Sequence, residues 1–374
     1  LSARNIKILT RDRFALGLML ATAPIVSLLD VVLALVMSRT PFSFNEGDMA
    51  QVLITTFLLT IYGIMVGGIS QMREIVKEAD IYKRERLVNL KILPYVMSKI
   101  WVAALLAFYQ AAAYTIVHYL AFDMPGGTLE FIQVYITMVL ATLAGMMLGL
   151  FASALAPNSS SAPLIVIMLM LPQIVLAGAL IPVPGFISAP ISARWAFEAL
   201  MGITGPGSDV AKDLCWALPP DVRNEMSLED KLSAGCNCMG VNMLKEENCN
   251  HPGLGKFATA SVDQPLPTEP APLPPEPVRP VEPANQSDNV AMADFFAELK
   301  EYEVQVEAYK LQVDQYQKDR VAYETARAEL QVAVAPAEGV VRNFYNGVGF
   351  MYVNKEDTAA YIGKIVYTWS VQGT

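Results

Sequence analysis

Long apolar stretches alternate with short polar ones through the first half of the chain. Each stretch is about 20 residues long and almost free of charge, and a helix of that length crosses about 30 Å of hydrocarbon. The pattern therefore predicts five membrane-spanning helices, at about residues 14–37, 49–70, 100–122, 131–155 and 163–181.

A basic segment, residues 72–99, separates the second stretch from the third. It carries seven of the twelve Lys and Arg residues that precede residue 184, and the first thirteen residues carry four more. Short basic loops stay on the cytoplasmic side of a membrane. We therefore expect the N-terminus and the loop 71–99 to be cytoplasmic, and alternation of the spans then puts residues 186–374 outside.

The basic segment also has the spacing of an amphipathic helix over residues 72–86. Its apolar residues recur at helical intervals, and they are Met72, Ile75, Val76, Ala79 and Tyr82. Two interpretations stay open. The helix lies on anionic lipid at the interface, or it docks a cytoplasmic partner that pushes on the spans.

Composition and charge divide the chain at about residue 184. Hydrophobic residues make up 53% of the whole, and the mean hydropathy is +0.36, which is high for a soluble protein. The first part has 12 basic and 10 acidic residues, the second 15 basic and 26 acidic. Because the second part has an excess of acidic residues, we do not expect it to bind nucleic acid, which is also negatively charged. Because the chain begins at Leu1 without a signal peptide, we expect it to be part of a longer gene product.

Three polar side chains fall inside the predicted spans: Asp30, His118 and Gln173. Ionisable groups in spans are costly and are candidates for function. For Asp30 we favour the alternative that it reaches water near the outer end of its span. For His118 we favour an interfacial or hydrogen-bonded histidine over a proton relay.

All four cysteines lie in residues 186–263: Cys215, Cys236, Cys238 and Cys249. Clustered cysteines outside the cell favour disulfides. Cys236 and Cys238 are too close to bond to each other, so each is expected to pair with Cys215 or Cys249. A zinc site that adds His251 is the alternative, although the spacing matches no standard zinc pattern. We therefore predict no metal.

Two further regions follow the cysteines. Residues 264–287 are rich in proline and predict an extended, unpacked linker. Residues 288–335 predict one long helix, because tyrosines recur every seven residues at positions 302, 309, 316 and 323. This heptad helix is expected to pair with a copy of itself or to lie against the cysteine-containing part. The last segment, 336–374, is expected to lead to a sixth span beyond the end of the chain.

Catalytic motifs do not occur in the sequence. It has no Gly-x-x-x-x-Gly-Lys-Ser/Thr phosphate loop, no His-Glu-x-x-His and no Gly-x-Ser-x-Gly, and it contains two histidines. We predict no catalytic residue and do not expect this chain by itself to be an enzyme.

Residues 1–205 resemble the membrane domain of ABC transporters of the G subfamily, the white or pigment-exporter type. The motifs are Glu78, then Arg84, Glu85 and Arg86, then Tyr95-x-x-Ser-Lys, followed by segments 178–182 and 194–199. Departures are Asn89, where glycine is usual, and an outer region much longer than the usual third outer loop.

The resemblance implies an all-α permease domain in residues 1–185, of the bacterial type and set in the inner membrane. It implies an ATP-driven exporter that pairs with a second copy or a related half. Its nucleotide-binding domain would lie upstream and bind ATP and Mg, so the chain itself would hold no cofactor. Glu78, Arg84, Glu85 and Arg86 would couple that domain to the spans. The alternatives are a membrane-anchored interaction protein that uses the outer heptad helix, and a proton-coupled carrier that uses Asp30 and His118.

Overall fold

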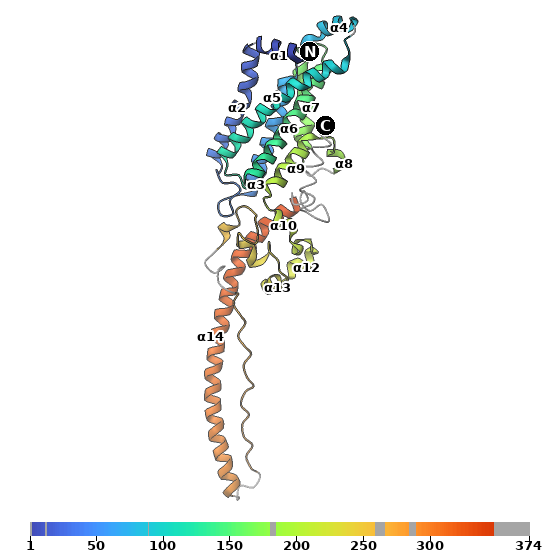
Figure 1. The fold of residues 1–374 in the computed structure, drawn as a ribbon. Coiled ribbons are helices and arrows are strands. Elements are labelled where there is room, and N and C mark those ends of the chain that lie inside the picture. Colours follow the sequence, from blue (N-terminus) through green and yellow to red (C-terminus); the bar gives the residue numbers. More distant parts are fainter. Residues whose placement is uncertain are drawn as a thin grey trace.

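The computed structural model describes residues 2–11, 13–88, 90–179, 185–258, 266–283 and 289–347. Within these ranges the regular structure is helical, without strands. The short helix α1 (Ser2–Arg11) and the helix α4 (Ala79–Leu87) lie at one end of a helical bundle, and the long helix α14 (Asn289–Gly347) projects from the other end (Figure 1).

Four helices of the bundle are long and apolar enough to cross a membrane: α2 (Arg13–Val36), α3 (Met49–Gln71), α5 (Ile92–Ala121) and α6 (Thr128–Leu155). They coincide with the first four predicted spans, and the all-α class is confirmed for the described residues. The fifth predicted span appears as α7 (Ala162–Val175), which has only 14 residues. Residues 180–184, where this predicted span ends, lie outside the described residues.

Glycines let α3 and α6 approach very closely. A Cβ atom on Gly145 would lie 2.1 Å from the backbone oxygen of Ile64, and one on Gly149 would lie 2.3 Å from that of Gly68. Gly67 meets the oxygen of Thr142 in the same way, at 2.3 Å. Small residues permit this kind of backbone contact between helices in a membrane.

The packed bundle extends past the boundary predicted at residue 185. Helix α9 (Ser192–Thr204) packs against α3 and α6, and its Phe197 meets Phe57 edge-on with ring centroids 5.9 Å apart. Ala193, Ala196 and Leu200 are buried among side chains of the bundle. The bundle therefore includes α9, although the sequence predicted that residues after 185 form a separate region.

A small unit that lies outside the helical bundle follows, built from short helices and disulfides; it is named the outer unit for this position beside the bundle. Its elements are α10 (Ser208–Lys212), α11 (Leu214–Ala217), α12 (Pro220–Glu225), α13 (Leu228–Ser233), η2 (Gly240–Leu244) and η3 (Gly255–Phe257); the preceding α8 is Gly185–Ser188. The core of this unit joins Trp216 and the four cysteines to Leu330, Val341 and Phe344 of α14. One end of α14 is thus part of the outer unit.

Helix α14 is longer than predicted, because it continues through Pro336 to Gly347. The proline-rich residues 266–283 run beside its projecting part (Figure 1), and residues 267–271 line a shared cleft with Asp319, Ala322 and Tyr323. The prediction of an unpacked linker is therefore wrong. The tyrosines at 302, 309, 316 and 323 are all half-buried, and Tyr323 lines the cleft that α14 shares with the proline-rich segment.

The two segments match because their repeats have similar lengths. Half-buried residues of the proline-rich segment recur about every three to four positions: Leu266, Pro267, Pro270, Leu273, Pro277, Pro280 and Pro283. A polyproline helix rises by roughly 3.1 Å per residue. Half-buried positions that recur every three to four residues are therefore about 11 Å apart. A heptad of α-helix advances by roughly 10.5 Å, so the two repeats have nearly equal lengths.

Candidate functional site

The segment after α3 forms no continuous helix, although one was predicted over residues 72–86. It contains a turn, a short 3₁₀ helix (η1, Val76–Glu78) and then α4. The Ser153 hydroxyl of α6 accepts hydrogen bonds from the backbone N–H groups of Ile75 and Val76, at 2.9 and 3.0 Å. These amides are thereby bound to α6 instead of to a preceding helical turn. The apolar stripe of the prediction is half-buried in the structure.

A buried lysine holds this segment against α5. Lys99 is 4% exposed, and its Nζ lies 2.9 Å from Glu78 Oε2 and 3.5 Å from Glu74 Oε2. The Tyr95 hydroxyl donates to the same Glu78 oxygen at 3.3 Å. A buried ammonium is tolerated because it is paired with carboxylates. This cluster therefore fixes the start of α4 to the start of α5.

A second ion pair holds the other end of α4 against α1. The Arg4 guanidinium donates to both carboxylate oxygens of Glu85, at 2.6 and 3.2 Å. These hydrogen bonds lower the pKa of Glu85 and raise that of Arg4. Because both side chains are substantially exposed, the pair contributes little stability.

Arg84 and Arg86 remain exposed on α4. Arg84 donates to the backbone oxygen of Asp80 at 3.3 Å, and neither arginine has a carboxylate partner among the described residues. Of the four predicted coupling residues, the structure therefore places Glu78 in the buried cluster, pairs Glu85 with Arg4 of α1 and leaves the two arginines at the surface. Sequence reasoning did not identify the pairing of Lys99 with Glu74 and Glu78. The sequence did contain a signal for this pairing: two glutamates spaced i, i+4 precede a lysine at the start of a predicted span.

The intramembrane polar residues Asp30 and His118 form a pair between α2 and α5. His118 Nδ1 lies 2.9 Å from Asp30 Oδ2, and the side chains are 1% and 0% exposed. The expectation that Asp30 reaches water is therefore wrong. Asp30 Oδ1 and His118 Nε2 have no hydrogen-bond partner among the described residues. Gln173, in contrast, caps α9, since its Oε1 accepts from the backbone N–H of Ala193 at 3.0 Å.

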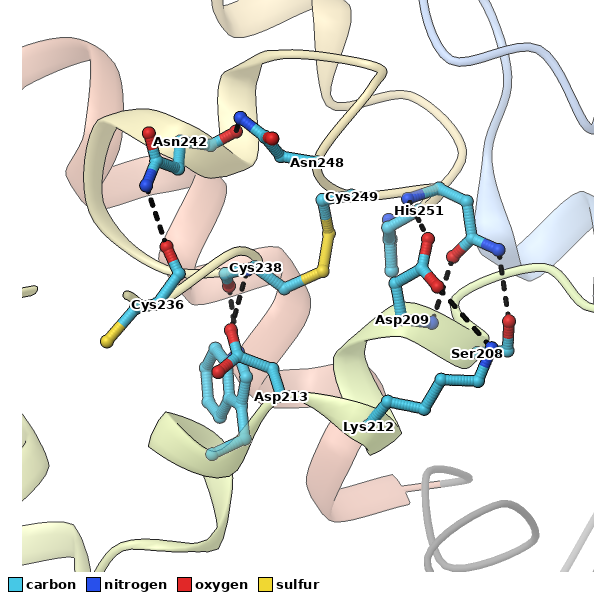
Figure 2. Close-up of a disulfide and its surroundings, with 12 residues drawn as sticks. Ser208, Asp209, Lys212, Asp213, Cys236, Cys238, Asn242, Asn248, Cys249 and His251 are labelled. Carbon is cyan, nitrogen blue, oxygen red and sulfur yellow. Dashed lines mark hydrogen bonds and ion pairs between the residues drawn. A yellow bond between two sulfur atoms is a disulfide. The ribbon is translucent and has the colours of Figure 1, made fainter. Parts of the chain in front are cut away.

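The four cysteines form two disulfides, Cys215–Cys236 and Cys238–Cys249. Figure 2 shows Asp213 beside the second of them, where its carboxylate accepts from the Cys238 N–H at 2.6 Å. No cysteine in the chain is free, so the alternative zinc site has no thiolate ligand. His251 is buried against Phe344 instead, and burial lowers its pKa to about 4.

Comparison with known proteins places residues 1–202 in a family. The family model of ABC-2 type transporters matches these residues, which are more than half of the chain. The chain belongs to the ABC-2 type transporter family. Over 192 residues it is also 28% identical to an ABC transporter ATP-binding/permease protein of Mycobacterium tuberculosis. That match covers 47% of this chain and 22% of the relative, so the chain spans far less than two thirds of the relative's length.

The ABC-2 membership explains the four long apolar helices and identifies the chain as a multi-pass transporter permease. Permease domains of ABC-2 transporters generally pair with nucleotide-binding domains and work in a membrane. The Lys99 cluster and α4 lie inside the matched residues of this ABC-2 transporter. The disulfides, the proline-rich segment and α14 lie after residue 202, outside the family match.

Proposed function

We propose that the chain is the permease half of an ATP-driven exporter of the G-subfamily type. It works as a dimer with a second copy or a related half, in the bacterial inner membrane. The nucleotide-binding domains bind ATP and Mg, and they dock on α4 from the cytoplasm. The mycobacterial relative is an ATP-binding/permease protein by name, which supports such a partner.

The observation that carries this proposal is the way α4 is held. Its start is fixed to α5 through the buried pair of Glu78 with Lys99, and the exposed pair of Glu85 with Arg4 links its end to α1. A push on α4 is therefore transmitted to two helices of the bundle. Arg84 and Arg86 flank Glu85, are exposed and offer positive charge to a docking domain. ATP binding then needs only to favour one of two packings of the spans.

The test uses the transporter with its nucleotide-binding domain, reconstituted in lipid. Because the four cysteines of this chain are paired, a cysteine introduced at the exposed Ala50, at the start of α3, can carry a spin label. Pulsed electron paramagnetic resonance then measures the distance between the labels of two copies. We expect ATP with vanadate to change this distance, and Arg84→Glu combined with Arg86→Glu to abolish the change.

The matched control is Lys83→Glu, also on α4, which should keep the change because the partner of Lys83 among the described residues is the exposed Asp80, at 3.8 Å. If the double variant responds to ATP and vanadate as the wild type does, α4 is not the coupling element.

A proton-coupled carrier is a second candidate, and the buried Asp30–His118 pair favours it. Under that mechanism a proton gradient alone drives the distance change, and Asp30→Asn abolishes it even when ATP is plentiful. Under the ATP-driven mechanism, a proton gradient without ATP leaves the distance unchanged.

A further inference from the structure

A cavity of about 470 Å³ opens between α2, α3 and the segment that follows α3. Its wall is apolar and includes Leu18 and Val26 of α2 and Val66 and Ile69 of α3. Its rim carries Arg73 and Lys77. The volume lies in the range of small-molecule sites.

The few polar groups of the wall are already satisfied by their own helices. The Thr22 hydroxyl donates to the Met19 backbone oxygen at 2.9 Å, and the Ser70 hydroxyl donates to that of Gly67 at 2.7 Å. The interior therefore offers little to a polar ligand, and it suits a hydrocarbon chain.

The rim has an excess of positive charge. Arg73 is exposed and forms no ion pair within the part of the chain that the structure describes, whereas Lys77 is paired with Glu74. Two cations and one carboxylate leave a net positive rim, at the end of the bundle where the basic helix α1 also lies (Figure 1). Such a rim attracts a phosphate.

We propose that this cavity binds an anionic phospholipid from the leaflet on the α4 side. One acyl chain lies along the wall formed by α2 and α3, and the headgroup phosphate binds Arg73 and Lys77. Glu74 also contacts Lys99, so the bound headgroup lies beside the cluster that anchors α4. The site does not depend on the proposed exporter mechanism, because lipid binding requires only the cavity and its rim.

Native mass spectrometry of the purified protein, released from nanodiscs with equal phosphatidylglycerol and phosphatidylcholine, tests the site. The wild type should retain phosphatidylglycerol preferentially. Arg73→Gln should lower that preference about fivefold, the effect of one basic residue near the membrane surface. Lys83→Gln removes an equal charge from α4 away from the cavity, and it should keep the wild-type preference.

A second variant tests the apolar wall. Leu18→Trp fills the mouth of the cavity from an exposed position and should reduce retention of both lipids. If Arg73→Gln keeps the wild-type preference, or if Lys83→Gln lowers it equally, the lipids bind by general surface attraction and the proposal is wrong. The proposal also fails if Leu18→Trp retains both lipids at the wild-type level.

Discussion

Replacing Lys99 with methionine tests the buried cluster that anchors α4. The substitution keeps most of the volume and removes the ammonium that lies between Glu74 and Glu78. Glu74 still has Lys77 as a partner, so Glu78 is the carboxylate left without a cation. Breaking a buried ion pair by removing one partner costs about 3–5 kcal/mol. In a domain of roughly 200 residues this lowers the melting temperature by about 6–20 °C.

The assay is thermal unfolding of the purified protein, with two further variants. Lys83→Met removes the cation of an exposed pair on α4 and should cost no more than about 1 kcal/mol. Adding Glu78→Gln to Lys99→Met neutralises the stranded carboxylate and should recover part of the lost stability. The reasoning is refuted if Lys99→Met destabilises no more than Lys83→Met, or if Glu78→Gln recovers nothing.

Three other predictions concern the helix contact, the outer unit and the proline-rich segment. Gly145→Ala should force α3 and α6 apart and lower the melting temperature. Gly17→Ala is the control and should not lower it, because a Cβ atom at position 17 meets no atom within 4 Å. Equal effects of the two substitutions on the melting temperature would contradict the close contact. Because the pKa of His251 lies at about 4 and rises to about 6.5 on unfolding, acidification from pH 6.5 to 4 should destabilise the outer unit by up to about 3 kcal/mol. His251→Gln should flatten this pH dependence in denaturant titrations, and an unchanged slope would exclude His251 as its source. Tyr323→Ala should speed hydrogen exchange in the projecting part of α14, because its side chain lines the cleft shared with the proline-rich segment, whereas the exposed Lys318→Ala should leave the exchange rate unchanged.

The hydrophobic pattern predicted the four long helices because each carries its own signal within one apolar stretch. Short-range reasoning also located the basic segment and the exposed arginines on α4. It did not find the break in the predicted helix at Ile75 and Val76, because the hydroxyl that binds their amides belongs to Ser153, 78 positions away. The Asp30–His118 pair was missed for the same reason, since its residues are 88 positions apart.

The outer half was harder to predict, because its contacts join dissimilar segments. The heptad of tyrosines predicted a copy of the helix or the cysteine-containing part as the partner of α14. The cysteine-containing part packs on one end of α14, and a proline-rich segment, which was not predicted to pack, runs beside its projecting part (Figure 1). The closeness of Cys236 and Cys238 left two disulfide pairings open, and only the folded chain distinguishes them. The burial of α9 in the bundle depends on contacts of Phe197 with α3, which no local pattern reveals.

The central claim is that α4 is the docking surface for a nucleotide-binding domain. The most direct measurement replaces Arg84 with the photo-crosslinker benzoylphenylalanine in the transporter that includes this domain, and identifies the cross-linked peptides by mass spectrometry. Leu129, exposed at the opposite end of the bundle, is the control position. We expect position 84 to cross-link to the nucleotide-binding domain and position 129 not to do so. Cross-links from position 84 to lipid alone would contradict the account.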